Sequence, residues 1–159
     1  FVDEKDEIMG YKTLEEIDKE DLTYRVSALW LTNSKGEILL AKRALTKSHH
    51  PGMWGPAAAG TVEKGETYEE NIIKKAEEEL GLKNINPKKG PITKSKSKYK
   101  HFTHWFFYEI DKEVKEFKIQ KEEVAEVKWF SLEEIKNLLE NNTKECIPSL
   151  INSFEILTK

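Results

Sequence analysis

The sequence predicts a fold that mixes α-helices and β-strands, of the α+β or α/β class, on three observations. Apolar-rich runs of strand length alternate along the chain with segments whose apolar residues recur at helical spacing. Two of the runs flank the short turn SKG, as strands of a β-hairpin do. The chain has 159 residues, enough for one sizeable core, so we expect a single domain over residues 1–159.

The first half of the chain predicts a strand pair and two short strands. Residues 2–17 indicate a short strand, a turn and a helix of one or two turns. The runs YRVSALWLTN and EILLAKRA, on either side of SKG, predict paired strands. The stretch PGMWGP predicts a loop, and AAAGTVE predicts a short strand.

A helix is expected to begin after Thr67. Thr67 and Glu70 have the spacing of a capping box, and Gly81 supplies the stop. Between them, apolar residues recur at helical spacing at Ile72, Ile73, Ala76 and Leu80.

The second half predicts further strands and two helices. NPKKGP indicates a loop, and residues 94–110 alternate as in a long strand or the arm of a hairpin. Residues 123–130 predict another strand. Ser131 caps a predicted helix over SLEEIKNLLENN, and residues 148–157 predict a final helix.

Composition excludes several classes of protein. A net charge of −3 creates no global field that favours nucleic acid or an anionic membrane. No apolar run approaches the roughly 20 residues of a membrane span. The lone Cys146 allows no disulfide within the chain, which fits a reducing cytoplasm. No signal peptide is visible, and because the sequence begins with Phe1 instead of Met, we expect the natural start to lie upstream.

The longest motif runs from Gly60 to Leu82, GTVEKGETYEENIIKKAEEELGL. A charged helix with Glu–Lys pairs four residues apart is the simpler interpretation of its acidic run. However, the spacing also resembles the signature of the Nudix hydrolase superfamily, G-x5-E-x7-R-E-U-x-E-E-x-G-U. The matching positions are Gly60, Glu66, Lys74, Ala76, Glu78, Glu79, Gly81 and Leu82. The glycines and Glu66, all in register, favour the family.

The resemblance implies a mixed sheet sandwiched between α-helices and a catalytic metal site. Glu78 and Glu79 correspond to the metal-binding carboxylates, Gly60 to a carbonyl ligand and Glu66 to the glutamate that orders the loop. Hard oxygen ligands of this kind suit Mg²⁺ or Mn²⁺, which neutralise a diphosphate. The expected reaction is hydrolysis of a diphosphate bond.

The sequence departs from the signature at Lys75, where the family has a glutamate. A lysine three residues from Glu78 and four from Glu79 can pair with either carboxylate and compete with a cation. We therefore expect weakened activity and a general base elsewhere. Glu122 and Glu123, before the late strand, are the candidates, with Glu123 the preferred one.

A closer resemblance within the superfamily is to isopentenyl-diphosphate isomerase. LWLTNSKGEILLAKR and RALTKSHHPGMWG carry it, and they place Arg43 and Lys47 where that enzyme holds its diphosphate. The isomerase's catalytic Cys and two His positions are Ala59, Thr61 and Tyr24 here. A methyl group cannot move a proton as a thiol does, so a hydrolase of the isomerase-like branch is the better interpretation.

The sequence thus predicts a cytoplasmic hydrolase that uses Mg²⁺ or Mn²⁺ on a nucleoside-diphosphate-X or similar organic diphosphate, such as a prenyl diphosphate. The alternative of another class is a diphosphate-binding or regulatory module whose turnover Lys75 has weakened. An isomerase is the third candidate. The expected partner is a small-molecule diphosphate, without nucleic acid or membrane, and a homodimer is compatible with the sequence.

Overall fold

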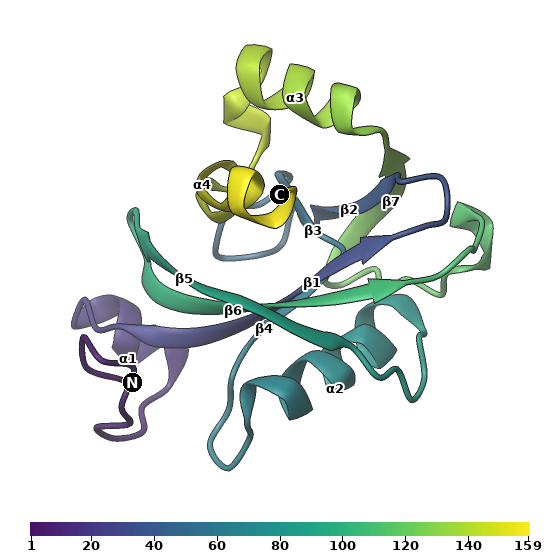
Figure 1. The fold of residues 1–159 in the computed structure, drawn as a ribbon. Helices are drawn as coiled ribbons and strands as arrows, with labels where there is room; N and C mark the ends of the chain where they lie inside the picture. The colour runs from purple at the N-terminus through teal and green to yellow at the C-terminus, as the bar shows by residue number, and fades with distance from the viewer.

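The structure, a computed structural model, describes residues 1–159 except for the side chain of Lys96. Its centre is a seven-stranded sheet with the path β3 (Trp54–Pro56), β2 (Ile38–Arg43), β1 (Tyr24–Thr32), β6 (Lys100–Glu109) and β5 (Lys88–Lys96) (Figure 1). Two further strands lie off this path: β4 (Ala58–Thr61) pairs with β1, and β7 (Val124–Phe130) pairs with β2. Strands β1 and β6 are parallel and the other pairs antiparallel. The predicted α+β class and mixed sheet are confirmed.

Helices cover both faces of the sheet. The long helix α2 (Tyr68–Leu80) lies on one face, and α3 (Leu132–Asn141) and α4 (Pro148–Leu157) lie on the other (Figure 1). The short helix α1 (Leu14–Lys19) lies beside the N-terminal end of the chain, and single 3₁₀ turns occupy Val114–Glu116 and Thr143–Glu145. No helix in the described part of the chain combines the length and the apolar character that a membrane crossing needs.

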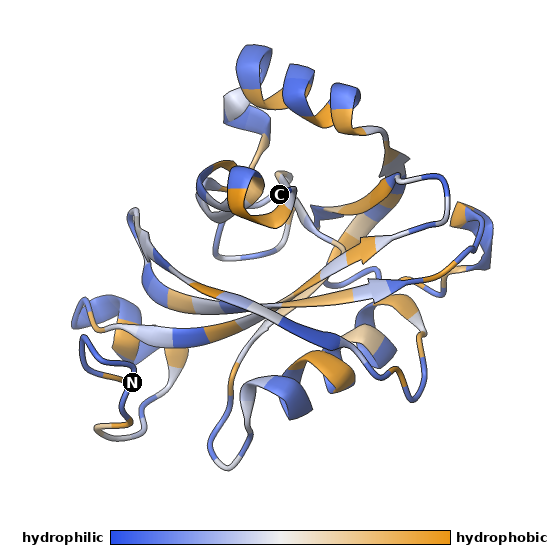
Figure 2. Cartoon of the chain, in the orientation of Figure 1, coloured by the Kyte–Doolittle hydropathy of each residue, from blue (hydrophilic) through white to orange (hydrophobic). Residues whose placement is uncertain are grey.

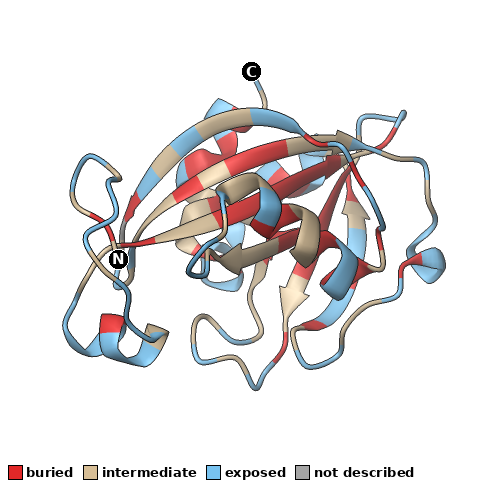
Figure 3. Ribbon diagram, turned by 90° about the horizontal axis from the view of Figure 1, so that it is seen from below, coloured by how far each residue is buried: buried red, intermediate tan, exposed pale blue. Residues whose placement is uncertain are grey.

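Alternation along β1 supplies two hydrophobic cores. Leu29 and Leu31 pack with Ile72 of α2 on one face, whereas Trp30 packs with Leu150 of α4 on the other. Figure 2 shows the apolar segments along the central strands and on α4, and Figure 3 shows buried residues along the same strands. Because both faces of β1 are buried at its centre, residues 28–31 form a continuous apolar run.

Local signals fix the helix ends as expected. The hydroxyl of Thr67 accepts from the backbone N–H of Glu70, and the Glu70 side chain accepts from the backbone N–H of Thr67. Gly81 ends α2 in the left-handed conformation, with φ of 73°. Ser131 caps α3 in the same way as Thr67 caps α2.

Two segments predicted as loops are strands. Trp54, Gly55 and Pro56 of PGMWGP form β3, and residues 88–91 of NPKKGP begin β5. Both strands lie at edges of the sheet. Proline has no backbone N–H, and at an edge its free side has no neighbouring strand that needs this donor. The register also shifts between Lys89 and Ile92, a bulge that accommodates Pro91. Residues 94–110, predicted as one long strand or one arm of a hairpin, instead contain the end of β5, a turn and the whole of β6, which pairs with β5.

The strand β1 changes partner along its length. Its residues 26–29 pair with β4, and its residues 31 and 32 pair with β2. Strands β2 and β4 therefore diverge, and residues of β1, β2, β3 and β4 all line one cavity beside this point.

Candidate functional site

The cavity has a volume of about 540 Å³ and gathers most of the predicted site residues. Six of the seven line it: Arg43, Lys47, Gly60, Glu66, Glu79 and Glu123. Glu78, the seventh, does not line it, and its side chain is 42% exposed. Residues from a strand end, a loop, a helix and a turn thus line one cavity.

Glu79 is the buried acid of the cavity. It is 6% exposed, and its Oε1 accepts a long hydrogen bond, 3.3 Å, from the backbone N–H of Ala59. Burial raises the pKa of Glu79 to about 7, although the Ala59 N–H and the charges of Lys75 and Lys47 act in the opposite direction. A carboxylate whose charge is this poorly compensated favours the binding of a further cation.

The raised pKa of Glu79 predicts that the metal-free protein loses stability as pH rises. The folded pKa of about 7 exceeds the reference of 4.5, so folded protein binds more protons between these values, and unfolding becomes easier from pH 4.5 to 7. Over this range the free energy of unfolding falls by about 3 kcal/mol because of Glu79. Urea unfolding in EDTA at pH 5 and pH 8, for wild type and Glu79→Gln, measures it. An equal pH dependence in the two proteins would show that Glu79 titrates normally.

Lys75 lies across Gly60 at the side of the cavity. A Cβ on Gly60 would be 2.5 Å from both Cγ and Cε of Lys75, so only glycine allows the lysine side chain this path. The ammonium lies 3.5 Å from Oε2 of Glu78, and Lys75 lines the cavity. The expected pairing with a neighbouring carboxylate is therefore present, with Glu78 as the partner.

Glu66 holds the loop before α2 in place. Its Oε1 accepts from the backbone N–H of Glu63 at 2.8 Å and from Nδ2 of Asn71 at 3.0 Å. Lys74 bridges Oε2 of Glu66 and Oε2 of Glu63 at 2.5 and 2.9 Å. The buried Asn71 also donates to the carbonyl of Thr61, a role that the sequence analysis missed. With these partners, both carboxylate oxygens of Glu66 are engaged in holding the loop.

Arg43, Lys47 and Glu123 lie around the end of β2. The ammonium of Lys47 forms an ion pair with Glu123, and the Ala44 N–H donates to the Glu123 carbonyl at 3.0 Å. Arg43 donates from Nε to the carbonyl of His49 at 2.9 Å. Burial lowers the pKa of Arg43, while the nearby charges of Glu79 and Glu123 oppose that shift. Two cations, Arg43 and Lys47, and two carboxylates, Glu79 and Glu123, thus line the same cavity.

A cluster of rings, which the sequence analysis did not predict, fixes the loop that carries Lys47. Nε2 of His49 lies 2.6 Å from Oδ2 of Asp18 in α1, and Nδ1 lies 3.4 Å from the hydroxyl of Tyr24. The imidazole also stacks on Tyr99, with centroids 3.6 Å apart and an interplanar angle of 11°. Since the His49 carbonyl accepts from Arg43, these contacts orient the guanidinium.

The donor groups fit a hard divalent cation, though not a preformed cage. In the described residues, no three His, Cys, Asp or Glu side chains are grouped to hold a metal ion. Lys75 lines the cavity at the position where the family signature has a glutamate, and Lys47 pairs with Glu123. Glu79 remains as a buried carboxylate with a single hydrogen bond, which suits Mg²⁺ or Mn²⁺.

Comparison with known proteins agrees with the motif. The model of the NUDIX domain matches residues 21–150. An uncharacterized Nudix hydrolase of Pseudomonas aeruginosa, PA4841, is 37% identical over 83 residues, which are 52% of this chain and 49% of that protein. The uncharacterized Nudix hydrolase YfcD of Escherichia coli is 27% identical over 162 residues, 94% of this chain and 82% of that protein.

One relative bears the name of the predicted closer resemblance. Isopentenyl-diphosphate Delta-isomerase 2 of Photorhabdus laumondii is 28% identical over 152 residues, 89% of this chain and 81% of that protein. Among solved structures, DR0079 of Deinococcus radiodurans superposes with a TM-score of 0.81 at 22% identity, covering 95% of this chain and 93% of that one. Because the domain model covers most of its length, the chain belongs to the Nudix family.

Proposed function

We propose that this Nudix protein hydrolyses the diphosphate bond of an organic diphosphate in the presence of Mg²⁺ or Mn²⁺. The observation that carries the proposal is the cavity, which is lined by the buried Glu79, by the acid Glu123 and by the cations Arg43 and Lys47. Cations of this kind bind phosphate oxygens through charge-assisted hydrogen bonds. A buried carboxylate beside them supplies the place for a metal ion.

Each residue has a defined part in the proposed reaction. Arg43 and Lys47 bind the oxygens of the diphosphate, and Lys47 exchanges Glu123 for a phosphate as it does so. Glu79 and the carbonyl of Gly60 would hold the cation, which neutralises charge on the phosphates when it is bound. Glu78 is available to the cation only after it leaves Lys75.

Hydrolysis then needs one water molecule and one base. The water oxygen forms a bond to phosphorus, and the bond from phosphorus to the bridging oxygen breaks. The proton of the water passes to the carboxylate of Glu123, which Lys47 has released. The products are two phosphate-bearing compounds.

Lys75 favours a second candidate, a diphosphate-binding module with weak turnover. Its side chain lines the cavity instead of pointing into solvent, so its charge acts on Glu79. An isomerase is less well supported, because the cavity presents the methyl group of Ala59 where the isomerase has its thiol. Tyr24, at a position where the isomerase has a metal-binding His, instead contacts His49.

A panel of organic diphosphates with Mg²⁺ or Mn²⁺, scored by release of phosphate or monophosphate, tests the proposal. Arg43→Ala and Lys47→Ala are each expected to raise KM about tenfold or more, since each loses a charge-assisted bond to phosphate. Lys42→Ala is the matched control, because Lys42 lies on the same strand outside the cavity and over the ring of Trp54.

Three outcomes would count against the proposed reaction. No release from any member of the panel would favour the binding module. An unchanged KM in both cavity variants would remove Arg43 and Lys47 from the diphosphate site. Conversion of isopentenyl into dimethylallyl diphosphate, observed by NMR above a control without protein, would favour the isomerase.

A further inference from the structure

The cavity has a second wall, away from Glu79, which the proposed hydrolysis does not use. His101 of β6 lies opposite Tyr24 of β1 and Ser95 of β5 in the strand registers, so the three residues form a row across the sheet. His50 and Tyr99 line the same part of the cavity, with their rings 5.4 Å apart. We call these five residues the imidazole wall.

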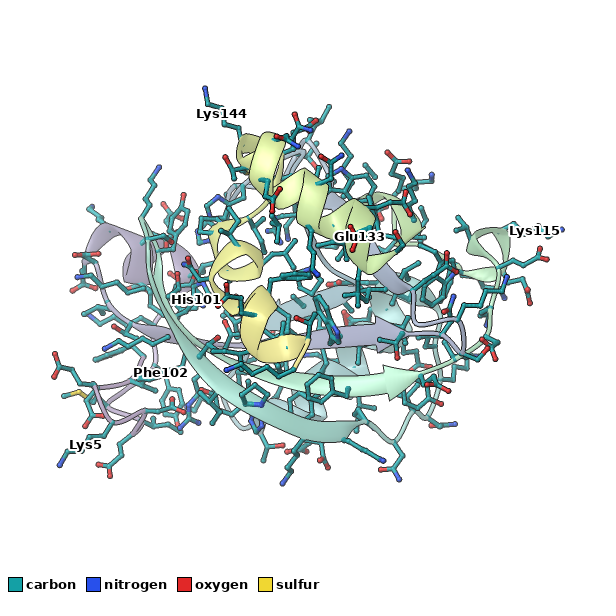
Figure 4. The ribbon with its side chains drawn as sticks, turned by 45° about the horizontal axis from the view of Figure 1, so that its top comes forward. Lys5, His101, Phe102, Lys115, Glu133 and Lys144 are labelled. Atoms are coloured by element: carbon teal, nitrogen blue, oxygen red, sulfur yellow. The ribbon has the colours of Figure 1, made fainter. Side chains whose placement is uncertain are left out.

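His101 lies on the side of the sheet that faces α4. Figure 4 shows it on the inner side of the curved β5–β6 ribbon, with Phe102 on the outer side. The cavity is also lined by Pro148 and Ser149, at the beginning of α4, and by Thr103, two residues along β6. Alternation along β6 thus directs His101 and Thr103 to the cavity and Phe102 away from it.

Arg43 connects the imidazole wall to the proposed diphosphate site. Its Nε donates to the carbonyl of His49, the residue before His50. Its guanidinium is close enough to interact electrostatically with Glu79 and Glu123 and also with Tyr24 of the wall. A group attached to a phosphate that Arg43 binds would therefore lie against the wall.

The wall offers hydrogen bonds that the protein leaves unused. Nδ1 of His101 lies 3.0 Å from the hydroxyl of Thr103, and the described residues give its Nε2 no partner. Among these residues, the His50 ring likewise makes no hydrogen bond, whereas both nitrogens of His49 have partners. Burial lowers the pKa of His101 to about 4 and also lowers that of His50, so both rings are neutral at pH 7. A neutral imidazole carries one donor and one acceptor.

We propose that the imidazole wall is the specificity subsite of this protein and that it takes a hydroxyl-bearing group, a sugar, linked to the diphosphate. The inference rests on the proposed function, because it assigns the part of the substrate beyond the diphosphate. Sugar hydroxyls both donate and accept, so they match His50 and His101. Tyr24 and Tyr99 supply ring surface beside them.

A prenyl chain is the competing occupant, because Val26, Ala28 and Ala59 make part of the cavity floor apolar. A hydrocarbon against the wall would displace water from His50 and His101 without replacing its hydrogen bonds. Each imidazole left unpaired in this way is expected to weaken binding about tenfold. The sugar is therefore favoured over the prenyl chain.

Calorimetric titration with Ca²⁺ in place of Mg²⁺, chosen to slow turnover, tests the subsite. The probes are inorganic pyrophosphate, ADP, 2′,3′-dideoxy-ADP and dimethylallyl diphosphate. We expect ADP to bind the wild type at least about tenfold more tightly than dimethylallyl diphosphate and dideoxy-ADP. His101→Phe and His50→Phe should each weaken ADP binding about tenfold and leave pyrophosphate binding unchanged. Unchanged pyrophosphate binding also shows that each variant is folded.

His104→Phe is the matched control. His104 lies on the same strand but outside the cavity, where its ring stacks on Phe106, so this variant should bind ADP as the wild type does. Equal binding of ADP and dideoxy-ADP, tighter binding of dimethylallyl diphosphate, or full ADP affinity in both imidazole variants would overturn the subsite while the diphosphate site stands. Failure of all four probes to bind would overturn the proposed function and the subsite together.

Discussion

Replacing Glu79 with glutamine is expected to lower kcat/KM for a diphosphate substrate by about 10²- to 10⁴-fold. Glutamine has nearly the same shape and keeps an oxygen that can accept from the Ala59 N–H. It carries no charge, so it removes the buried acid of the cavity and leaves its packing in place. Steady-state kinetics with Mn²⁺ and a substrate from the diphosphate panel measure the loss.

Glu77→Gln is the control for this substitution. Glu77 lies on the same helix, is exposed and does not line the cavity, so its replacement should leave kcat/KM within about twofold of the wild type. Comparable activity in Glu79→Gln and the wild type would exclude Glu79 from the chemistry. Equal losses in both variants would point to a general effect of charge on α2.

Replacing Lys75 with glutamate is expected to tighten Mn²⁺ binding at least about tenfold and to accelerate hydrolysis. Two unit charges 4 Å apart interact by about 4 kcal/mol at an effective dielectric constant of 20. Exchanging a cation for an anion in this cavity therefore has a large effect on the affinity for Mn²⁺. The change also releases Glu78, the present partner of Lys75. Calorimetric titration of Mn²⁺ and turnover of the same diphosphate measure the two effects.

Lys75→Gln separates repulsion from ligation. It removes the positive charge without adding a carboxylate, so its Mn²⁺ affinity should lie between those of the wild type and Lys75→Glu. If Lys75→Glu were no better than the wild type in either assay, the lysine would belong to a rearranged site, and its supposed competition with the metal would be wrong.

Elements with local signals could be predicted from the sequence. Helix α2 begins after Thr67 and ends at Gly81, because a capping box and a left-handed glycine act within a few residues of chain. Strand β3 was missed because the prolines and glycines of PGMWGP are also local signals, and they indicate a loop. Only the position of β3 at the edge of the sheet, a long-range property, makes Pro56 compatible with a strand.

The residues of the candidate site were likewise predictable only where a local sequence signal existed. The motif identified Glu78 and Glu79 together, while the structure places only Glu79 in the cavity. Helical phase was an available signal, because Glu79 follows the buried Ala76 by three residues and Ile72 by seven. The imidazole wall had no such signal. Its row of Tyr24, Ser95 and His101 depends on the pairing of β1 and β5 with β6, which no short stretch of sequence encodes.

Linked binding of Mn²⁺ and pyrophosphate tests most directly whether the cavity is a metal-dependent diphosphate site. Pyrophosphate affinity would be measured by calorimetry in EDTA and in Mn²⁺, with a correction for the complex that the two form in solution. The proposed site predicts that Mn²⁺ raises the affinity of the wild type at least about tenfold, and that Glu79→Gln loses this gain. Pyrophosphate affinity that is the same with and without Mn²⁺, or a gain that survives in Glu79→Gln, would contradict it.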